Sequence, residues 1–190
     1  TISTFVFASE QRINSLGGNV GHWADDDNSW TAFPHTLNNS NLAQVSGLGD
    51  SNIKKHSAIV RWGEGTKWGF SWDQNSENDM LNLQWGNGST IGATFGLSMS
   101  AEDNGDDTDG KATSTLGISV SGGMEMGFGE LGVGFSNSSE DDGDELTKDD
   151  PASMGLWVNF RRAQSIWLFD NMLVNFLYNS DNNPPQVSAD

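Results

Sequence analysis

Cysteine is absent from the chain, which excludes disulfide frameworks, cysteine-ligated zinc sites and thiol catalysis. Basic residues are scarce, since 9 lysines and arginines stand against 26 aspartates and glutamates. Such a chain lacks the basic patch that binds phosphates, which argues against nucleic acid and against an anionic cytoplasmic leaflet as partners. No apolar run reaches about 18 residues, so the sequence holds no candidate transmembrane helix.

Catalytic motifs are also scarce. The histidines, His22, His35 and His56, all fall in or near the first 55 residues, and no GxSxG motif occurs. Acidic residues are plentiful, but acids gathered in loops do not define a general acid and base. We therefore expect no enzyme. No signal peptide is seen at Thr1, so for an exported protein the numbering would start after cleavage.

What the sequence does contain is a period of two. Between Thr90 and Ser100 the odd-numbered residues are apolar, and the even-numbered residues are Gly, Ser or Thr. Residues 116–128 and 131–135 alternate in the same way. Because successive side chains of a strand point to opposite faces, each segment predicts a strand with one apolar face and one small, polar face.

The parity of the apolar positions locates the turns. A two-residue turn at Gly129-Glu130 would oppose Phe128 to Leu131 and keep every apolar residue on one side, whereas a turn at Gly122-Gly123 would mix the faces. By the same test, a loop over residues 86–88 opposes Leu83 to Ile91. In the apolar stretch 163–179 two turns stay open, at Ala163-Gln164 or at Asp170-Asn171.

The connections alternate in length along the chain. Short ones are expected near 63–67, 86–88 and 129–130, and longer polar ones at 73–79, 101–111 and 137–151. This alternation is typical of an up-and-down barrel in the outer membrane, with short periplasmic turns and long external loops. We expect an all-β, antiparallel transmembrane β-barrel with about eight strands in residues 56–179, followed by a loop or tail over 180–190.

A soluble β-sandwich also alternates apolar and polar residues, and it is the alternative fold. Three features favour the membrane. The polar face carries few of the long charged side chains of a solvated sheet, and the acids are segregated to loops. The third feature is a set of tryptophans near predicted strand ends, which fits an aromatic girdle at the lipid interface: Trp62, Trp68, Trp72 and Trp85.

Residues 12–37 resemble the N-terminal segment of the family that includes the outer-membrane long-chain fatty-acid transporters. The matching features are Arg12, the LGG at 16–18, the acidic run 25–27 and Pro34, although Phe33 stands where the family usually has Asn. The resemblance covers about a seventh of the chain. It implies a plug inside the barrel, assigned here to residues 1–55, and a barrel larger than these strands, in a family whose members transport hydrophobic molecules.

Several charged residues are candidates for the lumen or the plug. We expect the acidic run 25–27 to form salt bridges inside the barrel with Arg12 or Arg61, or to bind a cation. Glu125, a charge on the small face, is expected to line a pore, to pair with Arg61 or Arg161, or to contact the plug, and a structural ion pair is the simpler use. The lumen or plug candidates are Arg12, Asp25, Asp26, Asp27, Arg61 and Glu125.

The acidic loop at 102–110 resembles a calcium site in composition, because calcium takes several carboxylate and carbonyl oxygens. The Glu that an EF-hand needs at its twelfth position is missing, and a solvated acidic loop is the alternative for this segment and for 140–146. The candidate ligands are Asp103, Asp106, Asp107 and Asp109. No other cofactor is expected.

The sequence thus predicts a protein of the Gram-negative outer membrane with a role in passive transport of small or hydrophobic molecules or as a scaffold. Its expected partners are outer-membrane lipid or lipopolysaccharide, other envelope proteins, or copies of itself. The alternative function is a secreted or cell-surface β-sandwich that binds carbohydrate or calcium.

Overall fold

Residues 29–46, 56–74, 79–103, 112–141, 151–162 and 172–182 are described by a computed structural model of the chain. Two short 3-10 helices precede the strands, η2 (Ser29–Thr31) and η3 (Pro34–Asn38). The strands are β1 (Leu42–Ser46), β2 (His56–Trp62), β3 (Lys67–Gln74), β4 (Asp79–Gly86), β5 (Ile91–Asp103), β6 (Ala112–Met126), β7 (Gly129–Asp141), β8 (Ala152–Arg162) and β9 (Met172–Asn182). No helix in these ranges has the length and apolar character needed to cross a membrane.

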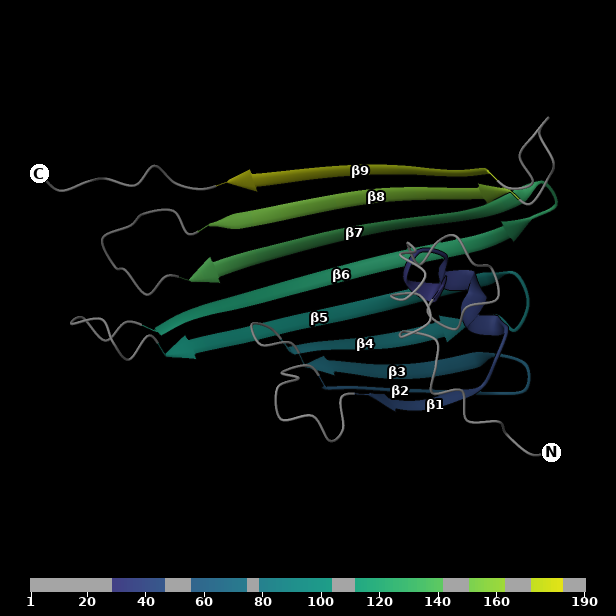
Figure 1. Ribbon diagram of the computed structural model, residues 1–190, viewed down its shortest axis with the longest axis horizontal. Helices are drawn as coiled ribbons and strands as arrows, with labels where there is room; N and C mark the ends of the chain where they lie inside the picture. Colours follow the sequence, from purple (N-terminus) through teal and green to yellow (C-terminus); the bar gives the residue numbers. More distant parts are fainter. Residues whose placement is uncertain are drawn as a thin grey trace, which may run out of the picture.

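The nine strands form one antiparallel sheet in the order of the sequence (Figure 1). The predicted all-β, up-and-down topology is confirmed. Among the described residues the sheet is not closed, since β1 and β9 each pair with a single neighbour.

The sheet has one strand more than the eight or so expected. Leu42–Ser46, inside the segment 1–55 for which no strand was predicted, pairs with β2 as β1. The apolar residues Leu42, Ala43 and Val45 do not alternate strictly with polar ones, and the pairing with β2 supplies the backbone hydrogen bonds instead. At the other end, β9 reaches Asn182, so the strands extend beyond residue 179 into the expected tail.

Cross-strand register places the apolar side chains on one face, called here the apolar face. Leu97 opposes Leu81 and Ile118, and Val120 opposes Phe95 and Phe135. Because directly opposed residues point to the same side, the row continues from strand to strand. The residues predicted to share this face do so, except Phe128, which lies in the turn after β6: Ile91, Phe95, Leu97, Leu116, Ile118, Val120, Met126 and Val133.

The opposite face, called here the polar face, carries the buried residues. η2 and η3 lie over it, against β4, β5 and β6 (Figure 1). Among the described residues the buried apolar side chains are Phe33 and Leu37, both from this region rather than from a strand. The sheet is therefore covered on its polar side.

The register of the β6–β7 hairpin differs from the prediction. Met126 opposes Gly129, so the turn is Gly127-Phe128, and Val120 rather than Met124 opposes Phe135. Gly129 has φ of 156°, a conformation open to glycine, and it follows the turn instead of opening it. A shift of two residues in each strand preserves parity, which is why the face was correct and the register was wrong.

The β4–β5 hairpin shows the same error. Leu83 opposes Phe95 rather than Ile91, and the loop spans residues 87–90. The side-chain Oδ1 of Asn87 accepts hydrogen bonds from the N–H groups of Ser89 and Ile91 at 2.9 and 3.0 Å, which closes the longer loop. Gly122-Gly123 lies within β6, as expected. Both candidate turns in 163–179 fall in 163–171, outside the described residues.

Paired cysteines test the β6–β7 register against a clean background, because the chain has no cysteine. The pair Val120→Cys and Phe135→Cys is expected to form a disulfide, since these residues are Cα partners and antiparallel partners lie about 4.5–5.5 Å apart. The control pair Met124→Cys and Phe135→Cys is about 13 Å apart and should stay reduced. Mass spectrometry after mild oxidation reads the outcome, and a disulfide in the control pair alone would restore the originally predicted register.

Candidate functional site

Glycines of the sheet form the floor on which residues 29–38 rest. A Cβ atom at Gly123 would lie 2.8 Å from Cδ of Pro34, and one at Gly92 would collide with the backbone oxygen of Pro34. A Cβ atom at Gly132 would collide with the backbone oxygen of Ala32. A helix backbone can approach a sheet this closely only where side chains are absent.

The sequence located part of this floor. The alternation predicts that six glycines face inward, close to the N-terminal segment: Gly92, Gly96, Gly117, Gly127, Gly132 and Gly134. Gly92 and Gly132 do lie against it. At Gly96, Gly117 and Gly134 the space for a Cβ atom is filled by side chains of neighbouring strands, and Gly127 belongs to a turn. Gly123 was missed, and so was Gly86, where a Cβ atom would meet the side chain of Asn38.

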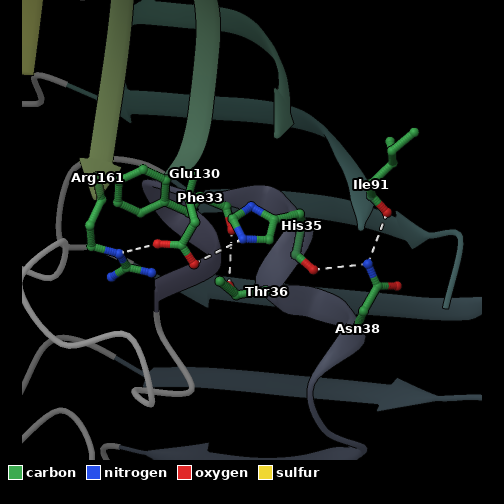
Figure 2. A network of polar contacts seen from close by, with 7 residues as sticks. All are labelled: Phe33, His35, Thr36, Asn38, Ile91, Glu130 and Arg161. Atoms are coloured by element: carbon green, nitrogen blue, oxygen red, sulfur yellow. Dashed lines mark hydrogen bonds and ion pairs between the residues drawn. The ribbon is translucent and has the colours of Figure 1, made fainter. Parts of the chain in front are cut away.

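The centre of the candidate site is an ion-pair network between the segment and the sheet (Figure 2). Oε1 of Glu130 on β7 lies 3.1 Å from Nε2 of His35 in η3, and Oε2 accepts a hydrogen bond from Nε of Arg161 on β8. The side chains of His35 and Arg161 are 4% and 5% exposed, and that of Glu130 is 23% exposed. One carboxylate thus joins β7, β8 and η3.

An aromatic ring completes this network. Cζ of Arg161 lies 4.4 Å from the ring centroid of Phe33, and the rings of Phe33 and His35 meet edge to face at 6.2 Å. A guanidinium above an aromatic face adds a cation–π attraction of about 0.5–2 kcal/mol. Arg161 is therefore held by a carboxylate and by a ring, and it is buried between them.

A polar side chain fixes the C-terminal end of η3. Nδ2 of Asn38 donates to the backbone oxygens of His35 and Ile91 at 2.9 and 3.0 Å, and Oδ1 accepts from the N–H of Gly88 at 2.7 Å. At the other end Pro34 is the first residue of η3, where the lack of a backbone N–H removes no hydrogen bond within the helix. Asn38 therefore ties the helix end to β5 and to the β4–β5 loop.

Two further bonds hold the start of the segment. Nδ2 of Asn159 on β8 donates to the backbone oxygen of Ala32 at 3.3 Å, and Oγ1 of Thr36 donates to the backbone oxygen of Phe33 at 2.9 Å. Both bonds pair a backbone oxygen of the segment with a polar side chain. The contacts of Glu130 with His35 and Arg161, called here the clasp, hold residues 29–38 against the sheet together with these bonds.

Two of the predicted site residues are described. Arg61 is 3% exposed. It shares the polar face with Gly69 and Gln84, because a Cβ atom at Gly69 would lie 2.7 Å from Cγ of Arg61 and 2.5 Å from Oε1 of Gln84. Glu125 is exposed and is the Cα partner of Glu130. Arg161, one of the expected partners of Glu125, instead contacts Glu130. Arg12 and the acidic run 25–27 lie outside the described residues.

Glu130 and His35 are the site residues that sequence reasoning missed. Glu130 was assigned to the turn because the predicted hairpin was displaced by two residues in each strand. The correct register puts it directly opposite Glu125, on a strand. His35 is separated from it by 95 positions, and no local pattern links them.

The predicted calcium ligands are not tested as a set. Asp103 ends β5, while Asp106, Asp107 and Asp109 fall in 104–111, outside the described residues. In the part of the chain that the structure describes, no group of three or more His, Asp or Glu side chains is arranged to hold a metal ion.

Comparisons of the chain with protein-family models, with curated proteins and with solved structures each return no match.

Substitution of Glu130 tests the clasp. Glu130→Gln removes the negative charge between His35 and Arg161, and we expect a loss of about 1–3 kcal/mol in the free energy that holds η3 on the sheet, because Arg161 stays buried. Hydrogen exchange of the amides of residues 33–38 should rise accordingly. Glu125→Gln is the matched control, as the exposed Cα partner on the adjacent strand, and should leave exchange unchanged. Equal effects of the two variants would contradict the clasp.

Proposed function

We propose that this chain forms part of the wall of a bacterial outer-membrane β-barrel, and that the barrel serves passive transport or acts as a scaffold. The observation that carries the proposal is the inverted burial of the sheet. Large apolar side chains line an open face over nine strands, while the polar side chains that are buried on the strands all belong to the opposite face. A protein in water has the reverse arrangement.

The extent of the open apolar face supports lipid as its environment. Leu83 is 59% exposed, Leu116 53% and Phe176 55%, and exposed residues of this kind occur on every strand from β1 to β9. Monomeric soluble proteins rarely expose a contiguous apolar patch larger than a few hundred Å². A β-sandwich would cover this face with a second sheet, and the nine described strands all belong to one sheet.

The height of the apolar face also fits a membrane. Apolar positions run from Ile91 to Met99 on β5 and from Leu116 to Met124 on β6, interrupted only by small residues. The eight steps between nine residues, at about 3.4 Å each, give about 27 Å along the strand. Tilted transmembrane strands have about 9–11 residues, so this apolar length suits one crossing of the membrane.

Aromatic residues gather at one end of this face. Trp68 opposes both Trp62 and Trp85, so the three rings form a row across β2, β3 and β4 at the end with the short turns. At the same end the rings of Phe128 and Phe160 lie 6.3 Å apart. This row supports an interfacial girdle. Trp72 lies further along, opposite Ala58 and Leu81.

The polar face has the character of a packed lumen. Ser71, Asn82 and Gln84 are buried on adjacent strands, and Nε2 of Gln84 donates to Oγ of Ser71 at 3.4 Å. Thr94 and Ser121 share a hydrogen bond of 2.6 Å across β5 and β6. Short hydroxyl and amide side chains that bond to each other leave space for a segment inside the barrel.

Residues 29–38 support the plug that the resemblance to the fatty-acid transporters implies. Phe33 and Pro34, the end of the matching segment, are buried and rest on glycines of the sheet. In this proposal the segment occupies the lumen, and the glycine floor and the Glu130 clasp hold it there. The substrate is a small or hydrophobic molecule that passes beside it.

Charge is distributed unevenly along the strands and supports one orientation. The described lysines and arginines all lie at the end that holds the β2–β3, β4–β5 and β6–β7 turns, together with Glu64, Glu125 and Glu130: Arg61, Lys67, Arg161 and Arg162. The other end carries Asp73, Asp79, Glu140, Asp141 and Asp181 and no described lysine or arginine. We place this acidic rim outside the cell, where divalent cations would bridge it to lipopolysaccharide phosphates, and the short turns in the periplasm. The predicted alternation of connection lengths is wrong at two places, because only residues 75–78 separate β3 from β4, whereas residues 163–171 separate β8 from β9 at the end with the turns.

Spin labels test which face meets lipid. Single cysteines at residues 116, 118 and 120 should be accessible to a lipid-soluble quencher, and those at 117, 119 and 121 should be shielded from it. In the same system Val120→Arg should cost about 2–4 kcal/mol of stability because it puts a charge near the bilayer midplane, whereas Ser119→Arg on the polar face should cost less. Exposure of the opposite set, or recovery of the protein as a soluble monomer from washed cells, would replace the barrel by a soluble β-sandwich.

The orientation has its own measurement. A cysteine in place of Asp141, at the acidic rim, should react with a membrane-impermeant maleimide on intact cells. A cysteine in place of the exposed Glu64, in the β2–β3 turn, should react only after the outer membrane is permeabilised. The opposite pattern would invert the protein in the membrane.

A further inference from the structure

The strand β9 presents a long, unprotected edge. Its pairing with β8 runs without a break from Arg162↔Met172 to Ala152↔Asn182, so no bulge twists the strand away. Proline and lysine, which blunt edge strands in soluble proteins, are absent from β9, and its one charge is Asp181 near the end. Such an edge is a template for pairing with another strand.

β9 is also apolar on both sides. Val174, Phe176 and Tyr178 continue the apolar face, since they oppose Phe160, Val158 and Leu156 on β8. Leu173 and Leu177 point to the polar side, where Leu177 is 66% exposed. The strand thus resembles an interior strand in its composition, although a single neighbour accompanies it.

Strand direction restricts what can pair with this edge. Neighbouring strands alternate in direction through eight antiparallel pairs, so β1 and β9 run the same way. Direct closure of β9 on β1 would create one parallel pair in an otherwise antiparallel sheet. A second copy in the same membrane orientation offers edges of that same direction, and it too could add only parallel pairs.

We propose that β9 and β1 are bridged by an odd number of antiparallel strands from the same polypeptide, outside the nine described here. The inference rests on the proposed function, because closure is demanded by the membrane, where an unpaired backbone edge cannot bond to water. We assign the bridging strands to the same polypeptide because every described strand pairs with its neighbours in sequence. Their number is odd because single-chain bacterial barrels have even strand numbers and nine strands are described here. The strand beside β9 carries apolar residues level with Val174, Phe176 and Tyr178.

A photo-cross-linker on β9 tests this assignment in the full polypeptide, in its own outer membrane. With benzoylphenylalanine in place of Phe176, the adduct should keep the mass of one polypeptide, and peptide mapping should join β9 to a segment other than β8. Ile118 on β6 is the matched control, because that strand is paired on both sides, and its protein adducts should map to β5 and β7. An adduct of doubled mass, an adduct with another protein, or cross-links to lipid and β8 alone would overturn the proposal.

Strand direction supplies a second measurement. Solid-state NMR of the reconstituted polypeptide should show Hα–Hα contacts between β9 and its new neighbour, which are characteristic of antiparallel pairs, and a parallel pattern would overturn the inference. These outcomes are separable from the proposed function. Lipid exposure of residues 116, 118 and 120 with a dimeric β9 adduct would keep the membrane assignment and reject the bridging strands.

Discussion

Strict alternation of side chains along paired strands is the constraint on which the structure depends. In each strand the odd and even positions point to opposite faces, and antiparallel pairing transmits that choice to the next strand. Leu83, Phe95 and Val120 therefore lie in one row although they belong to three strands. The same rule gathers Asn82, Gly96 and Ser119 on the other side. A single period thus produces both the open apolar face and the polar face on which residues 29–38 rest.

The consequence for stability is that the usual hydrophobic core is displaced. If the apolar face meets lipid, as proposed, it gains little by association, because hydrocarbon tails are as apolar as leucine. The sheet is instead held by its backbone ladder, and the buried apolar contacts come from Phe33 and Leu37 on the polar side. Glycines make this possible, since the close approach of Pro34 to Gly123 leaves no space for a Cβ atom. The segment therefore takes the place of a core and selects small residues in the strands beneath it.

The sequence predicted the faces of this sheet well and its registers poorly, for one physical reason. Burial depends on parity, and a hairpin displaced by two residues in each strand keeps parity while every partner changes. For that reason Phe128 was predicted in a strand and lies in a turn, and Glu130 was predicted in a turn and lies in a strand. β1 was missed because Leu42 and Ala43, both apolar, break the alternation of its five residues. The candidate site could not be predicted from the sequence, because His35 and Glu130 come together only when the strands up to β7 have paired.

The position of the clasp has a physical rationale in this arrangement. Glycines secure residues 29–38 to β4, β5, β6 and β7, where the backbone approach is closest, but they offer no directional bond. Glu130 and Arg161 add that bond at β7 and β8, and Asn38 adds it at β5. Together these contacts reach from β4 to β8 across the polar face. A segment tied to several adjacent strands resists the shear by which antiparallel strands change register, because sliding any one strand would break its contacts with the segment. The clasp thus holds the register that parity alone leaves open.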